Sequence, residues 1–310
     1  MRIYMAPMEG LTTYIYRQTY AKYFGGIDRY YTPFLSSFHL SNREREDILP
    51  EHNKGLDVVP QILTNRPEEF LAIAKTLQEY GYQEVNLNLG CPSGTVVAKH
   101  RGSGMLTDVG ELNRFLDALF AACPVAISVK TRIGIFSESE WEDILEVYGR
   151  FPIKELIIHA RLQKDFYREP VRPHTFLQAK ECLGNKMPLC YNGDIVSRES
   201  MQRLRALIPD MDGIMLGRGL VTNPDLPGEM RGEMPSSTET YRAFVEELFV
   251  EYYHRIQGGD RNILYKMKEV WVYLGNHFPN SDKYLKKIKK ANTVREYELA
   301  VDALFREFAG

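Results

Sequence analysis

The chain has 310 residues, of which 44% are hydrophobic and 26% are charged. This composition is ordinary for a globular protein and supplies enough apolar side chain for a sizeable core, so it argues against intrinsic disorder. The formal net charge of -2 gives no overall signal for nucleic acid, and a surface that binds a polyanion would have to come from local segregation of charge.

Short apolar or β-branched runs recur through the first two thirds of the chain and predict eight strands. They are Arg2–Ala6, Asp28–Phe34, Val58–Leu63, Glu84–Leu89, Val125–Thr131, Glu155–His159, Leu189–Asn192 and Gly213–Leu216. Helix-length segments with apolar residues at 3.6 spacing separate most of them, for example after Pro67 and after Asp108. Alternating strands and helices predict parallel pairing, and eight such strands suit closure into an α/β TIM barrel. An open doubly wound sheet is the alternative.

The last part of the chain has a different pattern. The stretch Asn223–Ser237 is rich in Pro, Gly and Ser and lacks periodicity, so it predicts a linker. Beyond it, apolar residues follow helical spacing in Tyr241–Tyr252 and again in Val294–Phe308. We therefore expect a barrel domain over residues 1–235 and a small all-helical domain over residues 236–310.

The cysteines and the N-terminus bear on location. The four cysteines form no C-x-x-C pair, and nothing at the N-terminus resembles a secretory signal. We expect neither disulfides nor a metal site, and a cytoplasmic location. No apolar run approaches the roughly 18 residues of a membrane span.

Almost every predicted strand ends in polar residues, which is where TIM barrels place their chemistry. A single one could serve as a cap or turn, but the whole set predicts an active site at the mouth of the barrel. The set comprises Pro7–Gly10, Gln61, Asn88, Cys91, Lys130, Arg132, His159, Arg161, Asn192–Asp194 and Gly217–Gly219.

Two of these motifs, NGDI from Asn192 and LGRG from Leu216, place glycines where backbone amides can converge on an anion, and Arg218 can add charge. They predict a phosphorylated cofactor or substrate, although tight turns alone would explain each motif. Lys130 on an apolar strand needs an anionic partner. A reduced flavin would provide one, because its pyrimidine edge is negative, and Gln61 and His159 could hydrogen-bond the same cofactor.

The segment Val85–Leu106, VNLNLGCPSGTVVAKHRGSGML, resembles the signature of the tRNA-dihydrouridine synthase family. The opening APMEGLT, the SVKTRIG around Lys130, the HAR at His159, the NGDI and the LGRG fall in the family's order, so the resemblance covers the whole barrel. The basic helical tail is similar to the family's C-terminal RNA-binding domain. One departure is Thr13, where the family often has Asp, and any role tied to that Asp is left open.

The resemblance implies that the cofactor is FMN, reduced by NADPH, and that hydride passes to carbon 6 of a uracil in tRNA while Cys91 protonates carbon 5. A thiol with a pKa of about 8.5 is mostly protonated at neutral pH, which suits a proton donor. No G-x-G-x-x-G follows a strand, so NADPH would have to visit the exposed flavin face.

The implied contacts fall into two groups. The flavin contacts are Pro7, Met8, Glu9, Gln61, Lys130, His159, Asn192, Gly193, Asp194, Gly217 and Arg218. The substrate contacts are Asn88, Lys99, Arg101 and Arg161, and the stretch Ser93–Ser103 is expected to close over the base, with Lys99 and Arg101 near RNA phosphate.

Between Arg261 and Arg295 there are nine Lys or Arg and two acids, a local net charge of +7, which favours a nucleic-acid partner. We expect the interleaved aromatic residues Tyr265, Trp271, Tyr273 and Tyr284 to pack in a helical core rather than to stack on bases. Two alternatives are an FMN barrel oxidoreductase for a free pyrimidine or another enone-like molecule, and a noncatalytic RNA-binding protein. No obligate protein partner is implied, and neither the modified uridine nor the oligomeric state can be predicted.

Overall fold

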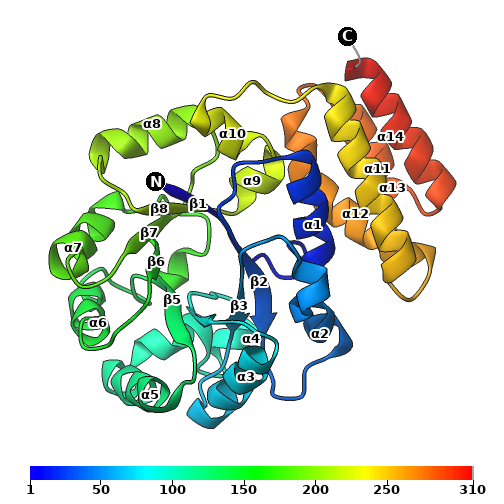
Figure 1. Ribbon diagram of the computed structural model, residues 1–310. Coiled ribbons are helices and arrows are strands. Elements are labelled where there is room, and N and C mark those ends of the chain that lie inside the picture. The colour runs from blue at the N-terminus through cyan, green and yellow to red at the C-terminus, as the bar shows by residue number, and fades with distance from the viewer. Residues whose placement is uncertain (309–310) are drawn as a thin grey trace.

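Eight parallel strands close into a barrel in sequence order, with β8 pairing back onto β1, in a computed structural model that describes residues 1–308 (Figure 1). The strands are β1 (Arg2–Met5), β2 (Arg29–Leu35), β3 (Val58–Ile62), β4 (Glu84–Leu89), β5 (Ala126–Arg132), β6 (Leu156–His159), β7 (Leu189–Asn192) and β8 (Gly213–Leu216). Every strand prediction is confirmed to within one residue at each end. Closure excludes the open sheet.

Helices follow the strands around the barrel, and all but α9, which comes after β8, lie between two strands in the chain (Figure 1). They are α1 (Tyr14–Tyr23), α2 (Asn42–Ile48), α3 (Pro67–Glu79), α4 (Gly94–Val97), α5 (Val109–Ala122), α6 (Glu140–Tyr148), α7 (Pro173–Leu183), α8 (Arg198–Leu207) and α9 (Arg218–Thr222). Within residues 1–308, no helix has the length and apolar character needed to cross a membrane.

The segment predicted as a linker contains a short helix, α10 (Leu226–Arg231). Pro227 stands in its first turn, and Gly232 ends it with a φ of 88°, a left-handed conformation that suits glycine. Leu226 is fully buried, so part of this segment packs on the molecule. The linker prediction did not include this short helix.

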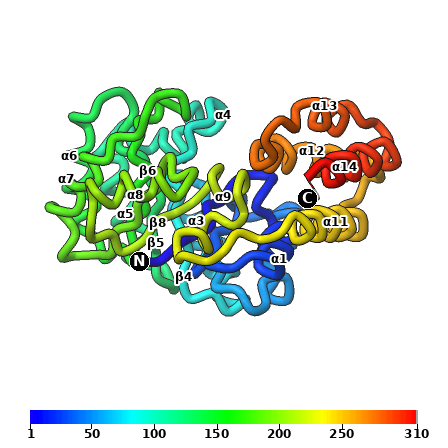
Figure 2. The backbone as a smooth tube through the Cα atoms, turned by 90° about the horizontal axis from the view of Figure 1, so that it is seen from above, coloured from blue at the N-terminus to red at the C-terminus, as the bar shows by residue number. Residues whose placement is uncertain are grey.

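The helical region that follows lies to one side of the barrel (Figure 2) and consists of α11 (Thr238–Arg255), α12 (Asp260–Leu274), α13 (Asp282–Lys290) and α14 (Val294–Phe308). It rests on α1 through aromatic side chains: Phe244 of α11 meets Tyr16 and Phe24 edge-on, with ring centres 5.8 and 5.1 Å apart. Its own core includes Trp271 and Tyr284, as expected. Tyr265 is 68% exposed, so the packing prediction is wrong for this residue, whose side of α12 faces away from that core.

The start of α1 is supported without the Thr13 side chain. The Thr13 side chain makes no capping hydrogen bond to α1. Instead, Asp47 of α2 accepts a hydrogen bond from the Tyr14 amide at 2.6 Å and pairs with the buried Arg17. A carboxylate from a different helix thus satisfies the first turn of α1.

Candidate active site

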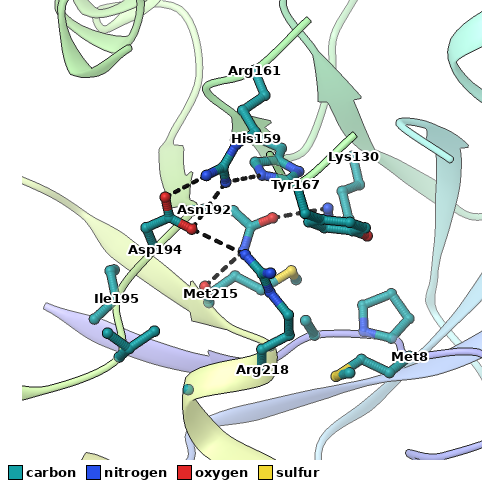
Figure 3. A pocket seen from close by; sticks show the side chains of 16 residues that line it. Met8, Lys130, His159, Arg161, Tyr167, Asn192, Asp194, Ile195, Met215 and Arg218 are labelled. Carbon is teal, nitrogen blue, oxygen red and sulfur yellow. Dashed lines mark hydrogen bonds and ion pairs between the residues drawn. The ribbon is translucent and has the colours of Figure 1, made fainter. Parts of the chain in front are cut away.

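Two adjoining cavities occupy the mouth of the barrel and share Pro7, Met8, Lys130, His159 and Tyr167. The smaller, of about 90 Å³, lies over the ends of β6, β7 and β8 and is called the anion pocket here (Figure 3). The larger, of about 350 Å³, contains Cys91 and is called the cysteine cavity. Strand ends supply most of the walls of both cavities, as the strand pattern predicted for polar residues at the mouth of the barrel.

The anion pocket is organised around one carboxylate. Asp194 accepts hydrogen bonds from Arg161 at 3.0 Å and from Arg218 at 3.1 Å (Figure 3). The turn that presents it needs left-handed backbone at Gly193 (φ 135°) and Asp194 (φ 50°). A Cβ on Gly193 would lie 2.6 Å from Val171, so only glycine fits there.

His159 is neutral in this pocket. Arg161 can only donate, so at 3.2 Å the Nε2 atom of His159 is the acceptor and its proton is on Nδ1. Burial, reinforced by the charges of Arg132 and Lys130, holds the pKa of His159 well below its usual range. His159 therefore presents a polar but uncharged edge to both cavities.

Lys130 lies where the two cavities meet. Burial, together with Arg132, lowers the pKa of Lys130 to about 8. Its Nζ donates to Asn192 Oδ1 at 3.0 Å, and Asn192 is itself held by the Met215 carbonyl at 2.8 Å. Among residues 1–308 no carboxylate forms an ion pair with Lys130.

The charges in the anion pocket fit a phosphorylated ligand. Three cations, Lys130, Arg161 and Arg218, face a single carboxylate, Asp194, so two positive charges are not neutralised by the protein. A partly buried cation without a counter-ion is costly unless a ligand supplies one. A ligand with negative charge both on a phosphate and elsewhere would balance this surplus, and the residues present therefore fit FMN.

A chain of amide side chains holds the cysteine loop. Asn88 Oδ1 accepts from the amides of Gly90 and Cys91 at 3.0 and 2.9 Å, and Asn88 Nδ2 donates to Gln61 at 2.7 Å. Gln61 in turn donates to Asn86 at 2.7 Å. The polar residues of β3 and β4 thus fix the position of Cys91.

The Cys91 thiol lies in the cysteine cavity and is partly buried. Burial raises its pKa, so the thiol carries its proton at neutral pH. The Ser103 hydroxyl donates to the Cys91 carbonyl at 2.8 Å, and a Cβ on Gly102 would lie 2.9 Å from that carbonyl. The segment after α4 therefore packs directly against the cysteine.

The structure places the other predicted residues as follows. Glu9 lines the cysteine cavity and pairs with Arg43 at 2.6 Å. Arg161 belongs to the anion pocket. Lys99 is exposed on the turn after α4, and Arg101 pairs with Glu69 at 3.3 Å, so neither lines a cavity.

Some lining residues were not predicted. Tyr167 is 52% exposed, lines both cavities, and lies under the Arg218 guanidinium, 4.6 Å from its ring centre. Glu269, Val272 and Tyr273 of α12 form one wall of the cysteine cavity. The strand-end pattern cannot reveal the latter three, because they come from the helical region.

Solved structures with a similar fold include a morphinone reductase and an old yellow enzyme homologue. A morphinone reductase in complex with tetrahydroNAD is 14% identical, covers 77% of this chain and 90% of its own, and gives a TM-score of 0.52. The old yellow enzyme homologue from Zymomonas mobilis is 14% identical, covers 77% of this chain and 92% of its own, and gives a TM-score of 0.51. At these identities the likeness establishes the fold alone.

Sequence comparison is more specific. The family model for dihydrouridine synthase (Dus) matches residues 4–307. A tRNA-dihydrouridine(16) synthase of Cupriavidus necator is 32% identical over 250 residues, which is 76% of this chain and 75% of the relative. A probable tRNA-dihydrouridine synthase 2 of Bacillus subtilis is 28% identical over 227 residues, which is 71% of this chain and 69% of the relative.

Barrel, anion pocket and family match together define a flavin-dependent oxidoreductase. The cysteine cavity adjoins the anion pocket, so a thiol lies close to that pocket. The chain belongs to the dihydrouridine synthase family.

Proposed function

We propose that this enzyme reduces a uridine of tRNA to 5,6-dihydrouridine, with FMN as its flavin, NADPH as reductant and Cys91 as proton donor. The observation that carries the proposal is that the two cavities share five lining residues, which we call the shared floor: Pro7, Met8, Lys130, His159 and Tyr167. The Cys91 thiol therefore lies beside a pocket with two unbalanced positive charges. The phosphate of FMN would be held by Arg218, Arg161 and the turn at Gly193. Because tRNA is the substrate, we place the enzyme in the cytoplasm.

The two halves of the reaction have separate requirements from the protein. A reduced flavin supplies hydride to carbon 6 of the uracil when it is bound. Lys130 and the neutral His159 belong to the shared floor, where a cation stabilises negative charge on a pyrimidine edge. Cys91 donates the thiol proton to carbon 5, and its raised pKa ensures that the proton is present at neutral pH.

The uridine has to leave its RNA stack to reach this floor, which costs a few kcal/mol, about 2 or more. We propose that the helical region offsets this cost by binding phosphates. Lys286, Lys287, Lys289 and Lys290 of α13 are all exposed, and none forms an ion pair within residues 1–308. Arg295 of α14 is exposed as well.

Two relatives named tRNA-dihydrouridine(16) synthase, from Cupriavidus necator and Ralstonia nicotianae, are 32% and 29% identical to this chain. We therefore propose position 16 as the modified uridine. A transcript with cytidine at that position serves as the matched control.

The test uses purified enzyme, NADPH and tRNA transcribed without modifications, with dihydrouridine mapped by position. The expected result is one dihydrouridine at position 16 and none in the control transcript. A yellow protein that ignores tRNA but reduces a free pyrimidine or an enone would overturn the tRNA assignment. A protein unable to bind FMN would overturn the enzyme mechanism.

A further inference from the structure

The segment that follows β6 exposes two aromatic rings beside the active site. Phe166 is 42% exposed and Tyr167 is 52% exposed. Tyr167 lines both active-site cavities (Figure 3), so Phe166 lies directly beside a wall of the site proposed for the uridine. The Gln163 side chain donates at 3.3 Å to the carbonyl of Pro92, the residue after Cys91. This segment is therefore joined to the loop that carries the thiol.

Phe166 has a backbone conformation that suits glycine. Its φ is 49° and its ψ is -100°. The Arg168 amide donates to the Asp165 carbonyl at 2.9 Å, which closes a turn with Phe166 as its second residue. These angles match the second position of a type II′ turn, where a residue with a Cβ is strained. Such strain persists only when the surroundings enforce it, and it is concentrated at functional sites.

Polar contacts enforce the strained turn. The Arg132 guanidinium donates to the Phe166 carbonyl at 2.9 Å. Asp165 is buried, accepts from the Leu162 amide at 2.9 Å and forms an ion pair with Arg172. The turn is thus fixed by hydrogen bonds and an ion pair, and its formation does not require the Phe166 ring to be buried.

The surface around the turn combines exposed rings with cations. Lys164 and Arg168 are exposed, and neither forms an ion pair in the part of the chain that the structure describes. Among residues 163–169, the acid without an ion pair is Glu169, which leaves a surplus of one positive charge. Phe136 is 64% exposed in the loop after β5, whose Ile135 carbonyl accepts from the Lys164 amide at 3.3 Å. Aromatic rings next to unpaired cations are typical of surfaces that bind single-stranded nucleic acid.

We propose that Phe166 stacks on the base of a nucleotide that directly flanks the target uridine of tRNA. This inference rests on the proposed function. A uridine inside the cysteine cavity remains bonded to a nucleotide on each side, so both neighbours lie at the rim of that cavity, which Tyr167 helps to form. Lys164 and Arg168 contribute attraction for the phosphates of the same strand. Because the strained turn already exposes the ring, RNA binding requires no rearrangement there.

Substitution by glycine separates stacking from a structural role. Phe166→Gly removes the ring, but glycine adopts the observed φ without strain, so the melting temperature should stay the same or rise. The dissociation constant for an unmodified tRNA transcript should increase about 10-fold, within the range for the loss of one stacked base. Flavin content and the rate of flavin reduction by NADPH should not change. A lower melting temperature with unchanged tRNA binding would overturn the proposal.

Two further variants serve as controls. Phe166→Tyr keeps an aromatic ring on the same backbone, so its tRNA dissociation constant should equal that of the wild type. Leu207→Ala controls for the loss of exposed apolar surface, because Leu207 is 59% exposed and ends α8, at the face of the barrel opposite the mouth. It should also bind tRNA normally. Equal weakening in Phe166→Tyr and Phe166→Gly would contradict stacking, and slower reduction by NADPH with unchanged tRNA binding would favour the reductant as the occupant.

Transcripts that lack a single base identify the stacked nucleotide. Abasic sites are placed immediately 5′ or 3′ of the target uridine. One of these transcripts should bind the wild type about 10-fold more weakly than the intact transcript does, but should bind Phe166→Gly equally well, a non-additivity that marks direct contact. Abasic sites that each affect both proteins equally would contradict the proposal. Binding is measured separately from turnover, so a wild type that binds tRNA yet forms no dihydrouridine would count against the proposed function instead.

Discussion

Asp194 makes a counterintuitive contribution to the anion pocket. It is a negative charge beside the proposed phosphate site, so Coulomb's law alone predicts that its removal tightens FMN binding. Its hydrogen bonds to Arg161 and Arg218, however, hold both guanidinium groups toward the pocket. We predict that Asp194→Asn raises the FMN dissociation constant about 10-fold, because bonds between charged groups set the geometry. Fluorescence titration of the apoprotein with FMN measures this dissociation constant. Tighter FMN binding by Asp194→Asn would contradict the role of Asp194 in positioning the two arginines.

Lys130 should make FMN affinity depend on pH. Its pKa in the free protein is lowered to about 8, and an anionic ligand favours the charged form and raises that pKa. Affinity is therefore greatest below the pKa of the free protein and falls as the pH rises through it. Titrations between about pH 6.5 and about 9.5 should show this decline in the wild type and not in Lys130→Met. The same slope in both proteins would contradict the assignment.

At the residue scale, a residue near the end of a predicted strand could be assigned to the mouth of the barrel from the sequence, whereas a residue in an irregular segment could not. Lys130 and His159 could be assigned to the mouth because the apolar pattern fixes where their strands end. Tyr167 could not, because it lies in the irregular segment between β6 and α7, next to Phe166 with a φ of 49°. The ion pair of Arg101 with Glu69 also could not be predicted from the sequence, because it joins residues 32 positions apart.

At the element scale, α13 should supply a salt-dependent part of tRNA binding. Lys286 and Lys290 lie one turn apart on its exposed side. We predict that Lys286→Gln/Lys290→Gln weakens tRNA binding and flattens the dependence of log Kd on log salt, by about 0.7 to 0.9 for each phosphate that the variant no longer neutralises.

A charge-matched control is Lys75→Gln/Lys154→Gln, which alters exposed lysines on the barrel. It should leave the salt slope as in the wild type. Equal effects of the two double variants would show that α13 acts only through net charge.

Element length decided which helices the sequence could predict. α11 and α14 have 18 and 15 residues, long enough for helical periodicity to be evident. α10 has six residues and includes Pro227, with Gly232 directly after it. It is too short for a periodic pattern, and its Pro and Gly content is typical of a linker. The same two residues, however, are the start and stop signals of a short helix.

At the scale of the whole molecule, the barrel and helical region should unfold together. Phe244 is fully buried against Tyr16, Tyr23 and Phe24 of the barrel. We predict that Phe244→Ala lowers the free energy of unfolding by about 3 to 5 kcal/mol. A single calorimetric transition should persist at a lower temperature. Two separate transitions, with the barrel unaffected, would show that the contacts of Phe244 do not couple the barrel to the helical region.

The overall architecture was only partly accessible from the sequence. Eight alternating units predicted a barrel, because a parallel strand needs a crossover helix and a count of eight closes the sheet. The position of the helical region was not predictable, since it depends on contacts such as Phe24 with Phe244, far apart in the chain. That position also places α12 at the wall of the cysteine cavity.

The most direct test of the account is single-turnover oxidation of the NADPH-reduced enzyme by unmodified tRNA, followed by flavin absorbance in wild type, Cys91→Ala and Cys123→Ala. Cys123 is a partly buried cysteine that lines neither cavity of the active site. We predict that Cys91→Ala binds flavin and is reduced normally, but that its oxidation by tRNA slows at least about 100-fold, the usual contribution of a general acid. Cys123→Ala should match the wild type. A Cys91→Ala enzyme that is oxidised by tRNA at the wild-type rate would contradict the central claim.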